Sequence, residues 1–201
     1  MKYRLFDICM VKSERLLLGI FVASLLVGSC TGKTDALNDN SDWKQRVETE
    51  LKKRLGKKMI LPKNLTIVPG DTTCISERSP LKLVTFIDGS CSACIGNLRY
   101  WAEFIRKTRK NKLDCSFHIY IRTNLNSDFE KILDDTGFHY SWIQDEQEVL
   151  VTVNDIHDKR FETALLDKDS TTILFGDPIF REELADLYWR VIKERSSVTP
   201  N

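Results

Sequence analysis

The clearest pattern of apolar and polar positions lies near the middle of the chain. An unbroken, mostly apolar and β-branched run at 81–87 predicts a buried strand. The polar residues at 88–90 predict a turn directly after it. Apolar residues then recur at spacings of three and four, which predicts an amphipathic helix. They are Cys94, Leu98, Trp101, Ala102 and Ile105. The chain is therefore expected to run here from a strand through a tight turn into a helix.

Other segments on both sides show similar periodic patterns. N-terminal to the centre, we expect a helix from 42 to about 56 and two short extended pieces, 59–62 and 65–68. The elements expected on the C-terminal side are a strand at 115–121, a helix at 127–135, a strand at 138–143, a helix at 146–153, an antiparallel hairpin of 161–166 with 171–175, and an amphipathic helix around 184–191.

The N-terminus resembles an export signal. Lys12 and Arg15 precede an apolar segment at 16–27, which is too short for a comfortable membrane span. The segment ends Leu-Val-Gly-Ser-Cys, which resembles a bacterial lipobox and predicts a lipid on Cys30. A plain signal peptide cleaved near Ser29, with Cys30 incidental, is the alternative. Either Met1 or Met10 can be the start of the chain.

Charge and composition narrow the function classes. The 201 residues are 42% hydrophobic and 29% charged, which allows a packed core and argues against global disorder. The formal net charge is +1, and removal of residues 1–29 leaves 26 basic and 27 acidic residues. This near-neutral balance gives no electrostatic reason to expect a nucleic-acid partner.

Two thiols, Cys91 and Cys94, stand where the central strand passes into the helix. Unpaired amide groups and the helix dipole favour a thiolate on Cys91, whereas Cys94 lies one turn into the apolar stripe and should be shielded. A redox dithiol is the favoured interpretation, and a static disulfide or half of a zinc site are the alternatives. Ile95 stands where a c-type haem motif needs histidine. We expect no cofactor and no metal.

The segment VTFIDGSCSACIGNL resembles the active-site region of thioredoxin-like proteins, and FETALLDKDSTTILFGDP resembles their closing hairpin. The wider chain resembles the membrane-anchored thiol–disulfide oxidoreductases and redoxin-type lipoproteins of bacteria. The resemblance implies an α/β, thioredoxin-like fold with a central mixed β-sheet flanked by helices and an N-terminal helical and extended extension. The domain plan is then a lipoprotein signal peptide at 1–29, a flexible tether at 30–41, the N-terminal helix and extended segment at 42–80 and a thioredoxin-like domain at 81–201.

The same resemblance implies a function. Cys91 would attack a partner disulfide and Cys94 would resolve the mixed disulfide, so the partners would be protein thiols or disulfides and a further, unidentified redox partner. The expected location is the bacterial cell envelope, periplasmic or surface-facing, with the protein held on a membrane by its N-terminal lipid. The alternative is a non-catalytic binding module of the same fold. It would be either a partner-binding lipoprotein or a copper chaperone, for which His157 is the candidate third ligand.

The sequence departs from the thioredoxin pattern at three points. Thioredoxins place a cis-proline that docks the substrate immediately before the first strand of the hairpin. Glu162, preceding Thr163, occupies the matching position here, and no proline is near; Glu162 and Thr163 are our candidate docking residues. Ser90 replaces the usual aromatic residue before the first cysteine. Thr85 stands where many thioredoxins have a buried acid. These departures bear on substrate range and rate more than on the fold.

Two further cysteines, Cys74 and Cys115, remain in the exported part of the chain. An oxidising compartment favours a structural disulfide between them. Two unpaired core thiols are an equally acceptable interpretation, because cysteine packs well as a small hydrophobe. Cys115 begins a strand, so a bridge would lie at the end of the sheet opposite the Cys91–Cys94 pair.

Overall fold

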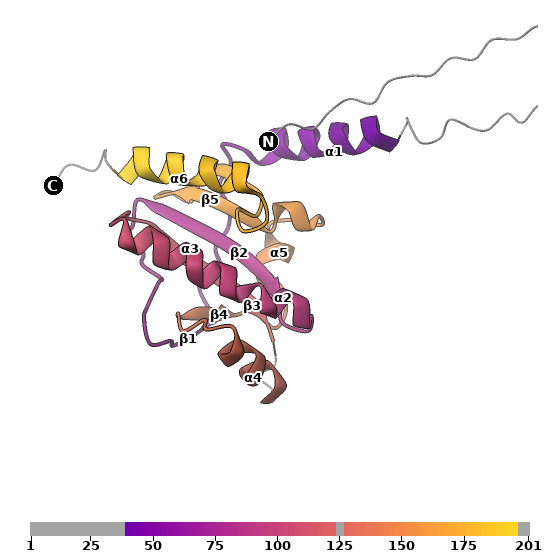
Figure 1. The fold of residues 1–201 in the computed structure, drawn as a ribbon. Helices are drawn as coiled ribbons and strands as arrows, with labels where there is room; N and C mark the ends of the chain where they lie inside the picture. The colour runs from indigo at the N-terminus through magenta and orange to yellow at the C-terminus, as the bar shows by residue number, and fades with distance from the viewer. Residues whose placement is uncertain (1–38, 124–126, 197–201) are drawn as a thin grey trace, which may run out of the picture.

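The computed structural model describes residues 39–123 and 127–196, which form one mixed β-sheet with helices on both faces (Figure 1). The strands run in the order β1-β4-β3-β2-β5-β6. They are β1 (Thr66–Val68), β2 (Leu81–Asp88), β3 (Ser116–Arg122), β4 (Trp142–Gln144), β5 (Thr163–Asp167) and β6 (Thr172–Phe175). β2, β3 and β4 are parallel, whereas β1, β5 and β6 each pair antiparallel with their neighbours.

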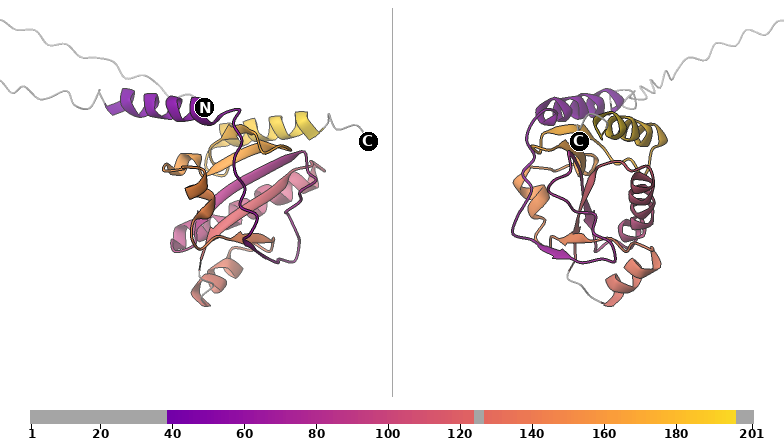
Figure 2. Two further views of the ribbon diagram at one scale, coloured as in Figure 1. Left: turned by 180° about the vertical axis from the view of Figure 1, so that it is seen from behind. Right: turned by 90° about the vertical axis from the view of Figure 1, so that its left-hand side faces the viewer.

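The helices form a layer on each side of this sheet. They are α1 (Asp39–Arg54), α2 (Ser92–Gly96), α3 (Leu98–Lys110), α4 (Ser127–Asp135), α5 (Val149–Val153), the 3-10 helix η1 (Lys159–Phe161) and α6 (Glu182–Ser196). The edge-on view of Figure 2 shows α3 and α5 on opposite sides of the sheet. α1 and α6 lie at the end of the molecule nearest β5, and α4 lies at the other end.

The alternation of side chains along β2 divides the core into two parts. Leu81 and Leu83 face α3, where they join a cluster that includes the fully buried Trp101. Val84 and Phe86 face the other way and pack in a second cluster with Leu150 of α5. Because β2 is buried on both faces, its sequence reads as a continuous apolar run.

Most of the elements predicted from the sequence are confirmed, with two corrections. The helix after the two thiols is not continuous: α2 ends at Gly96 and α3 starts at Leu98. At the junction the amide of Asn97 bonds the carbonyl of Cys94, only three residues back, and glycine weakens a helix at this point. The strand predicted at 138–143 is shorter and later, since β4 begins at Trp142.

Several sequence predictions concern residues outside the described ranges. These are the signal peptide, both candidate start residues, the lipidated Cys30 and most of the tether, all within residues 1–38. Within residues 39–123 and 127–196, no helix has the length and apolar character needed to cross a membrane.

Candidate functional site

The Cys91–Cys94 turn lies at the carboxyl end of β2, where the strand passes into α2. Cys91 is the N-cap residue of α2, with extended backbone angles (φ −104°, ψ 108°). Its Sγ accepts a hydrogen bond from the amide of Cys94 at 3.3 Å. The sulfur of Cys91 therefore takes the place of the oxygen that normally caps a helix, and it satisfies one of the unpaired amides there.

A glycine fixes the position of this turn. The amide of Gly89 donates to the carbonyl oxygen of Arg122 at 2.9 Å, which ties the turn to the end of the neighbouring strand β3. A β-carbon at Gly89 would lie 2.4 Å from that same oxygen. The two backbones approach so closely that only glycine fits without a shift.

The two thiols differ strongly in acidity. Hydrogen bonds from the side chain and then the amide of Cys94 lower the pKa of Cys91. Burial, followed by the hydrogen bond with Cys91 and the charge on it, raises the pKa of Cys94 to about 11. A thiolate is therefore favoured on Cys91 over Cys94.

Beside the turn lies an ion-pair group of Asp88, Arg122 and Glu148, here called the Arg122 cluster. Arg122 Nη2 lies 2.7 Å from Asp88 Oδ1, and its Nη1 pairs with the Glu148 carboxylate. The same guanidinium donates to the hydroxyl of Ser90 at 3.0 Å. Although burial opposes it, hydrogen bonding from Ser90 and Arg122 lowers the pKa of Asp88 to about 2. Arg122 thus compensates a carboxylate whose charge would otherwise disfavour the Cys91 thiolate.

Two of the positions that depart from the thioredoxin pattern, Thr85 and Glu162, line the same cavity as Cys94. Thr85 and Thr163 face each other across β2 and β5, and the Oγ1 atoms of these two buried residues are 2.8 Å apart. The carbonyl oxygen of Glu162 accepts from the amide of Phe86 at 3.1 Å. Burial raises the pKa of the Glu162 carboxyl to about 7. The described residues contain no cis peptide bond.

A cavity of about 840 Å³ adjoins Cys94 and passes around the ends of β2, β5 and β6. Cys94, Thr85 and Glu162 line it, whereas Cys91 does not. Its apolar walls come from several elements: Val47, Leu51, Phe86, Ile87, Trp101, Phe161, Phe175, Ile179, Phe180 and Leu184. The site therefore combines a dithiol with an apolar space large enough for part of a partner molecule.

Cys74 and Cys115 are free thiols in separate surroundings. The sulfur of Cys74 lies 3.1 Å from the carbonyl oxygen of Ser141 and 3.4 Å from that of Phe117, and burial raises its pKa to about 11. Burial also raises the pKa of Cys115, whose sulfur lies 3.6 Å from the Ser116 carbonyl. Because β2 and β3 are parallel, Cys115 stands at the opposite end of the sheet from the Cys91–Cys94 turn.

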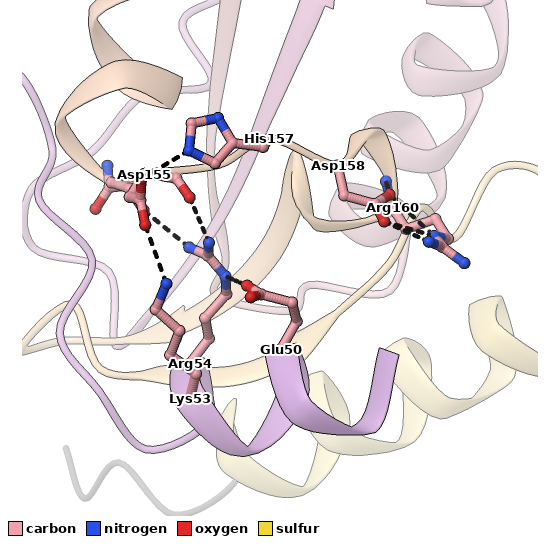
Figure 3. Close-up of polar contacts among 8 residues, drawn as sticks. Glu50, Lys53, Arg54, Asp155, His157, Asp158 and Arg160 are labelled. Carbon is pink, nitrogen blue, oxygen red and sulfur yellow. Dashed lines mark hydrogen bonds and ion pairs between the residues drawn. The ribbon is translucent and has the colours of Figure 1, made fainter. Parts of the chain in front are cut away.

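His157, the candidate ligand of the copper-chaperone alternative, lies after α5 (Figure 3). Its Nε2 is 2.7 Å from Asp155 Oδ1, and its side chain is 84% exposed. In the part of the chain that the structure describes, no group of three or more His, Cys, Asp or Glu side chains is arranged to hold a metal ion.

Some residues around the site were not singled out from the sequence. Arg122 and Glu148 are far from Cys91 along the chain, and Lys159 lines the cavity near Cys94. Asp177 also lines it, and burial raises the pKa of its carboxyl to about 6. The only signal in the sequence was that Asp177 follows the predicted hairpin directly.

Comparison with known proteins supports the fold. No family model matches the sequence, and no curated protein gives a match. A candidate protein disulfide isomerase from Bacteroides thetaiotaomicron is 15% identical, with a TM-score of 0.53 over 72% of this chain and 91% of that one. A candidate thiol:disulfide interchange protein DsbE from Chlorobium tepidum is 11% identical, with a TM-score of 0.50 over 70% of this chain and 97% of that one. The chain has the thioredoxin fold, as the sequence predicted.

Proposed function

We propose that this chain catalyses thiol–disulfide exchange with protein partners through Cys91 and Cys94. The observation that supports this best is the place of the Cys91 sulfur, which accepts a hydrogen bond from the amide of Cys94 at 3.3 Å at the start of α2. Cys91 caps α2 and has a lowered pKa, whereas Cys94 lies behind it with a pKa raised to about 11. A thiolate that is favoured at the surface next to a protonated, shielded thiol is the arrangement that exchange chemistry needs.

The reaction has two displacements. The Cys91 thiolate attacks one sulfur of a partner disulfide, forms a mixed disulfide and releases the other partner sulfur as a thiolate. Cys94 then loses its proton and attacks Cys91, which gives the Cys91–Cys94 disulfide and releases the second partner thiol. The charge on Cys91 helps to raise the pKa of Cys94, so its loss in the mixed disulfide prepares Cys94 for the second step.

We further propose that the protein works in the bacterial cell envelope, anchored to a membrane by a lipid on Cys30. The support is the apolar segment at 16–27 and the lipobox-like residues that end at Cys30. Each reduction of a partner leaves the pair as the Cys91–Cys94 disulfide, and an oxidising compartment does not reduce it again, so a separate redox partner must supply electrons to sustain turnover in this direction. Radiolabelled palmitate incorporated by the full chain and lost in Cys30→Ala would support the anchor.

The function is tested by alkylating the full chain in redox buffers of stepped potential. We expect Cys91 and Cys94 to pass together between dithiol and disulfide as a reversible two-electron couple. Cys91→Ser and Cys94→Ser should each abolish the couple, and Cys94→Ser should trap a mixed disulfide with a partner. A pair that stays oxidised in strongly reducing buffer would identify a static bridge and contradict the proposal.

A further inference from the structure

The second displacement makes a specific demand on the surroundings of Cys94. When Cys91 is held in a mixed disulfide, Cys94 must lose its proton before it can attack the Cys91 sulfur. Burial is the largest cause of the raised pKa of Cys94, and this cause remains when the charge on Cys91 is gone. Thr85 lines the same cavity, but its hydroxyl is bonded to that of Thr163 and is not a base. Another group must therefore favour the Cys94 thiolate.

The cations that line the cavity with Cys94 differ in their partners. One is shared by the two carboxylates of the Arg122 cluster, and Arg160 is paired with Asp158. In the described ranges, 39–123 and 127–196, the ammonium group of Lys159 has no ion-pair or hydrogen-bond partner. Lys159 lines the cavity and is exposed, so its charge is available to a neighbouring thiolate.

Lys159 begins η1, and this short helix is held at both ends. The carboxylate of Asp158 caps it by accepting a hydrogen bond from the amide of Arg160 at 2.9 Å. Phe161 ends it and is buried, and the rings of Phe161 and Phe175 lie 5.5 Å apart, edge to face. The backbone of Lys159 therefore has a defined place.

α1 and β2 hold the segments on each side of η1. Arg54 of α1 donates to the carbonyl oxygens of Asn154, at 2.8 Å, and Asp155, in the loop that leads into η1 (Figure 3). The residue after η1 is Glu162, whose carbonyl oxygen accepts from the amide of Phe86 in β2 at 3.1 Å. Because β2 runs on from here into the turn that carries the two thiols, η1 is held beside the dithiol.

The charges that act on Cys94, apart from its burial, come from three elements. Cys91 at the start of α2 and Asp88 of β2 disfavour a Cys94 thiolate, whereas the positive charge of Lys159 favours it. Asp88 is compensated within the Arg122 cluster, and Cys91 loses its charge in the mixed disulfide. The charge of Lys159 therefore gains weight in the second step.

Two other carboxyls line the cavity, on Glu162 and Asp177. Burial raises their pKa values to about 7 and about 6, and the charge of Lys159 opposes this rise at Glu162. Ionisation of Glu162 weakens the effect of Lys159, so this effect should be smaller at alkaline pH than near neutral pH.

We propose that Lys159 stabilises the Cys94 thiolate in the second displacement and so speeds the release of the partner. In this step the proton of Cys94 passes to water, and a bond forms between the Cys94 and Cys91 sulfurs. The bond between Cys91 and the partner sulfur breaks, and the partner leaves as a thiolate. Lys159 gives up no proton and forms no bond, so it acts through its charge. The proposal rests on the proposed function, because the step belongs to that reaction.

The test separates the two displacements with dithiobis(nitrobenzoate), a symmetric aromatic disulfide. The reduced full chain carries Cys9→Ser and Cys30→Ser, so that thiols outside the described residues do not react. At acid pH, where Cys94 is protonated, attack by Cys91 releases one thionitrobenzoate and leaves the other on Cys91. A jump to neutral pH starts the attack by Cys94, and release of the second coloured thiolate gives its rate. Cys94→Ser should show the first release without the second.

Removal of the charge should slow the second release and leave the first almost unchanged. Lys159→Gln should slow it roughly threefold to fivefold near neutral pH, as expected for one exposed charge, and by less in strong salt. Lys159→Glu should slow it further, whereas Lys159→Arg should keep the wild-type rate. The difference should shrink at alkaline pH, where Cys94 ionises in every variant. Arg181→Gln removes another exposed cation that lines the same cavity and is the matched control, expected to keep the wild-type rate.

Three results would overturn the proposal. One is a second release in Lys159→Gln and Lys159→Glu that is as fast as in wild type. Another is equal slowing by Arg181→Gln, since the effect would then belong to the overall charge of the cavity. The third is a loss that Lys159→Arg shares, because the lysine would then act through its packing. A wild-type chain that releases the first thionitrobenzoate and never the second would instead refute the proposed function, and this proposal with it.

Discussion

The hydroxyl oxygens of Thr85 and Thr163 lie 2.8 Å apart on neighbouring strands, at the edge of the cavity that Cys94 lines. Both side chains are buried, with 1% and 3% exposed. Each hydroxyl can donate to the other or accept from it, so one hydrogen bond satisfies two buried polar groups. A neutral, hydrogen-bonded pair of hydroxyls therefore occupies the site at which the resemblance to thioredoxins would have placed a buried acid.

This pairing predicts that the two threonines contribute to stability as a unit. Thr85→Val or Thr163→Val alone leaves a buried hydroxyl without its partner, and we expect each to cost roughly 1–3 kcal/mol in the free energy of unfolding. The double variant should cost much less than the sum, because both polar groups are gone. Urea denaturation of the wild type, the two single variants and the double variant measures the coupling free energy between the two threonines. Thr66→Val, at an exposed position in β1, is the control, and additive effects in the cycle would contradict the prediction.

The contact between Gly89 and β3 predicts a strict need for glycine before the two thiols. Gly89→Ala would place its β-carbon 2.4 Å from the Arg122 carbonyl oxygen, so the turn must shift. We expect a loss of roughly 1–3 kcal/mol in stability and slower alkylation of Cys91. A β-carbon at Gly96, in α2, meets nothing within 4 Å, so Gly96→Ala should be neutral or slightly stabilising. Equal effects of the two substitutions would show that the close approach does not restrain the turn.

The elements that could be predicted from sequence are those whose pattern is local. The apolar run of β2 and the stripe of α3 are set by which faces are buried, and the Cys91–Cys94 turn follows from their order. The break at Asn97 could not be predicted, because the stripe passes through it without interruption. A hairpin of two antiparallel strands was predicted correctly, whereas β4 was misplaced because it is only three residues long.

The surroundings of the site could be predicted less well than the site itself. Arg122 lies 34 residues from Asp88 and 26 from Glu148, and nothing in a single sequence links residues at such distances. The attachment of Arg54 to Asn154 spans 100 residues. The sequence showed α1 only as an amphipathic helix, and its place beside the cavity depends on this distant contact. The roles of the cysteines, of Glu162 and of Thr163 stay predictions.

The raised pKa of Glu162 predicts a pH-dependent contribution to stability. Burial raises the pKa of this carboxyl from 4.5 to about 7 in the folded chain. Between these values the unfolded chain binds fewer protons than the folded chain at this residue, so its contribution to stability falls as pH rises and is constant above about pH 7. His118 acts in the opposite sense over part of this range, since burial lowers its pKa to about 4. The difference in the free energy of unfolding between wild type and Glu162→Gln therefore isolates the contribution of the glutamate.

The measurement is the free energy of unfolding in urea at several pH values. We expect Glu162→Gln to gain stability relative to wild type as pH rises through this window, and the gain to level off at alkaline pH. Asp177 has the same sign of shift but is present in both proteins, so it cancels. Glu183→Gln, at an exposed position in α6, is the matched control for the removal of one carboxyl group. A flat curve for Glu162→Gln would show that its carboxyl is ionised in the folded chain at ordinary pH.

The Arg122 cluster predicts that a residue of β3 controls the reactivity of Cys91. Arg122→Ala removes the cation that compensates Asp88, and the negative charge of Asp88 opposes a thiolate on Cys91. We expect up to about tenfold less thiolate at a given pH, with the alkylation profile of Cys91 moved to higher pH. Asp88→Asn combined with Arg122→Ala should restore much of the reactivity, because the uncompensated charge is then gone. Arg106→Ala, which breaks an exposed 3.7 Å pair with Glu103, is the control and should leave the profile in place. An Arg122→Ala profile that coincides with wild type would show that the cluster only supports the turn mechanically.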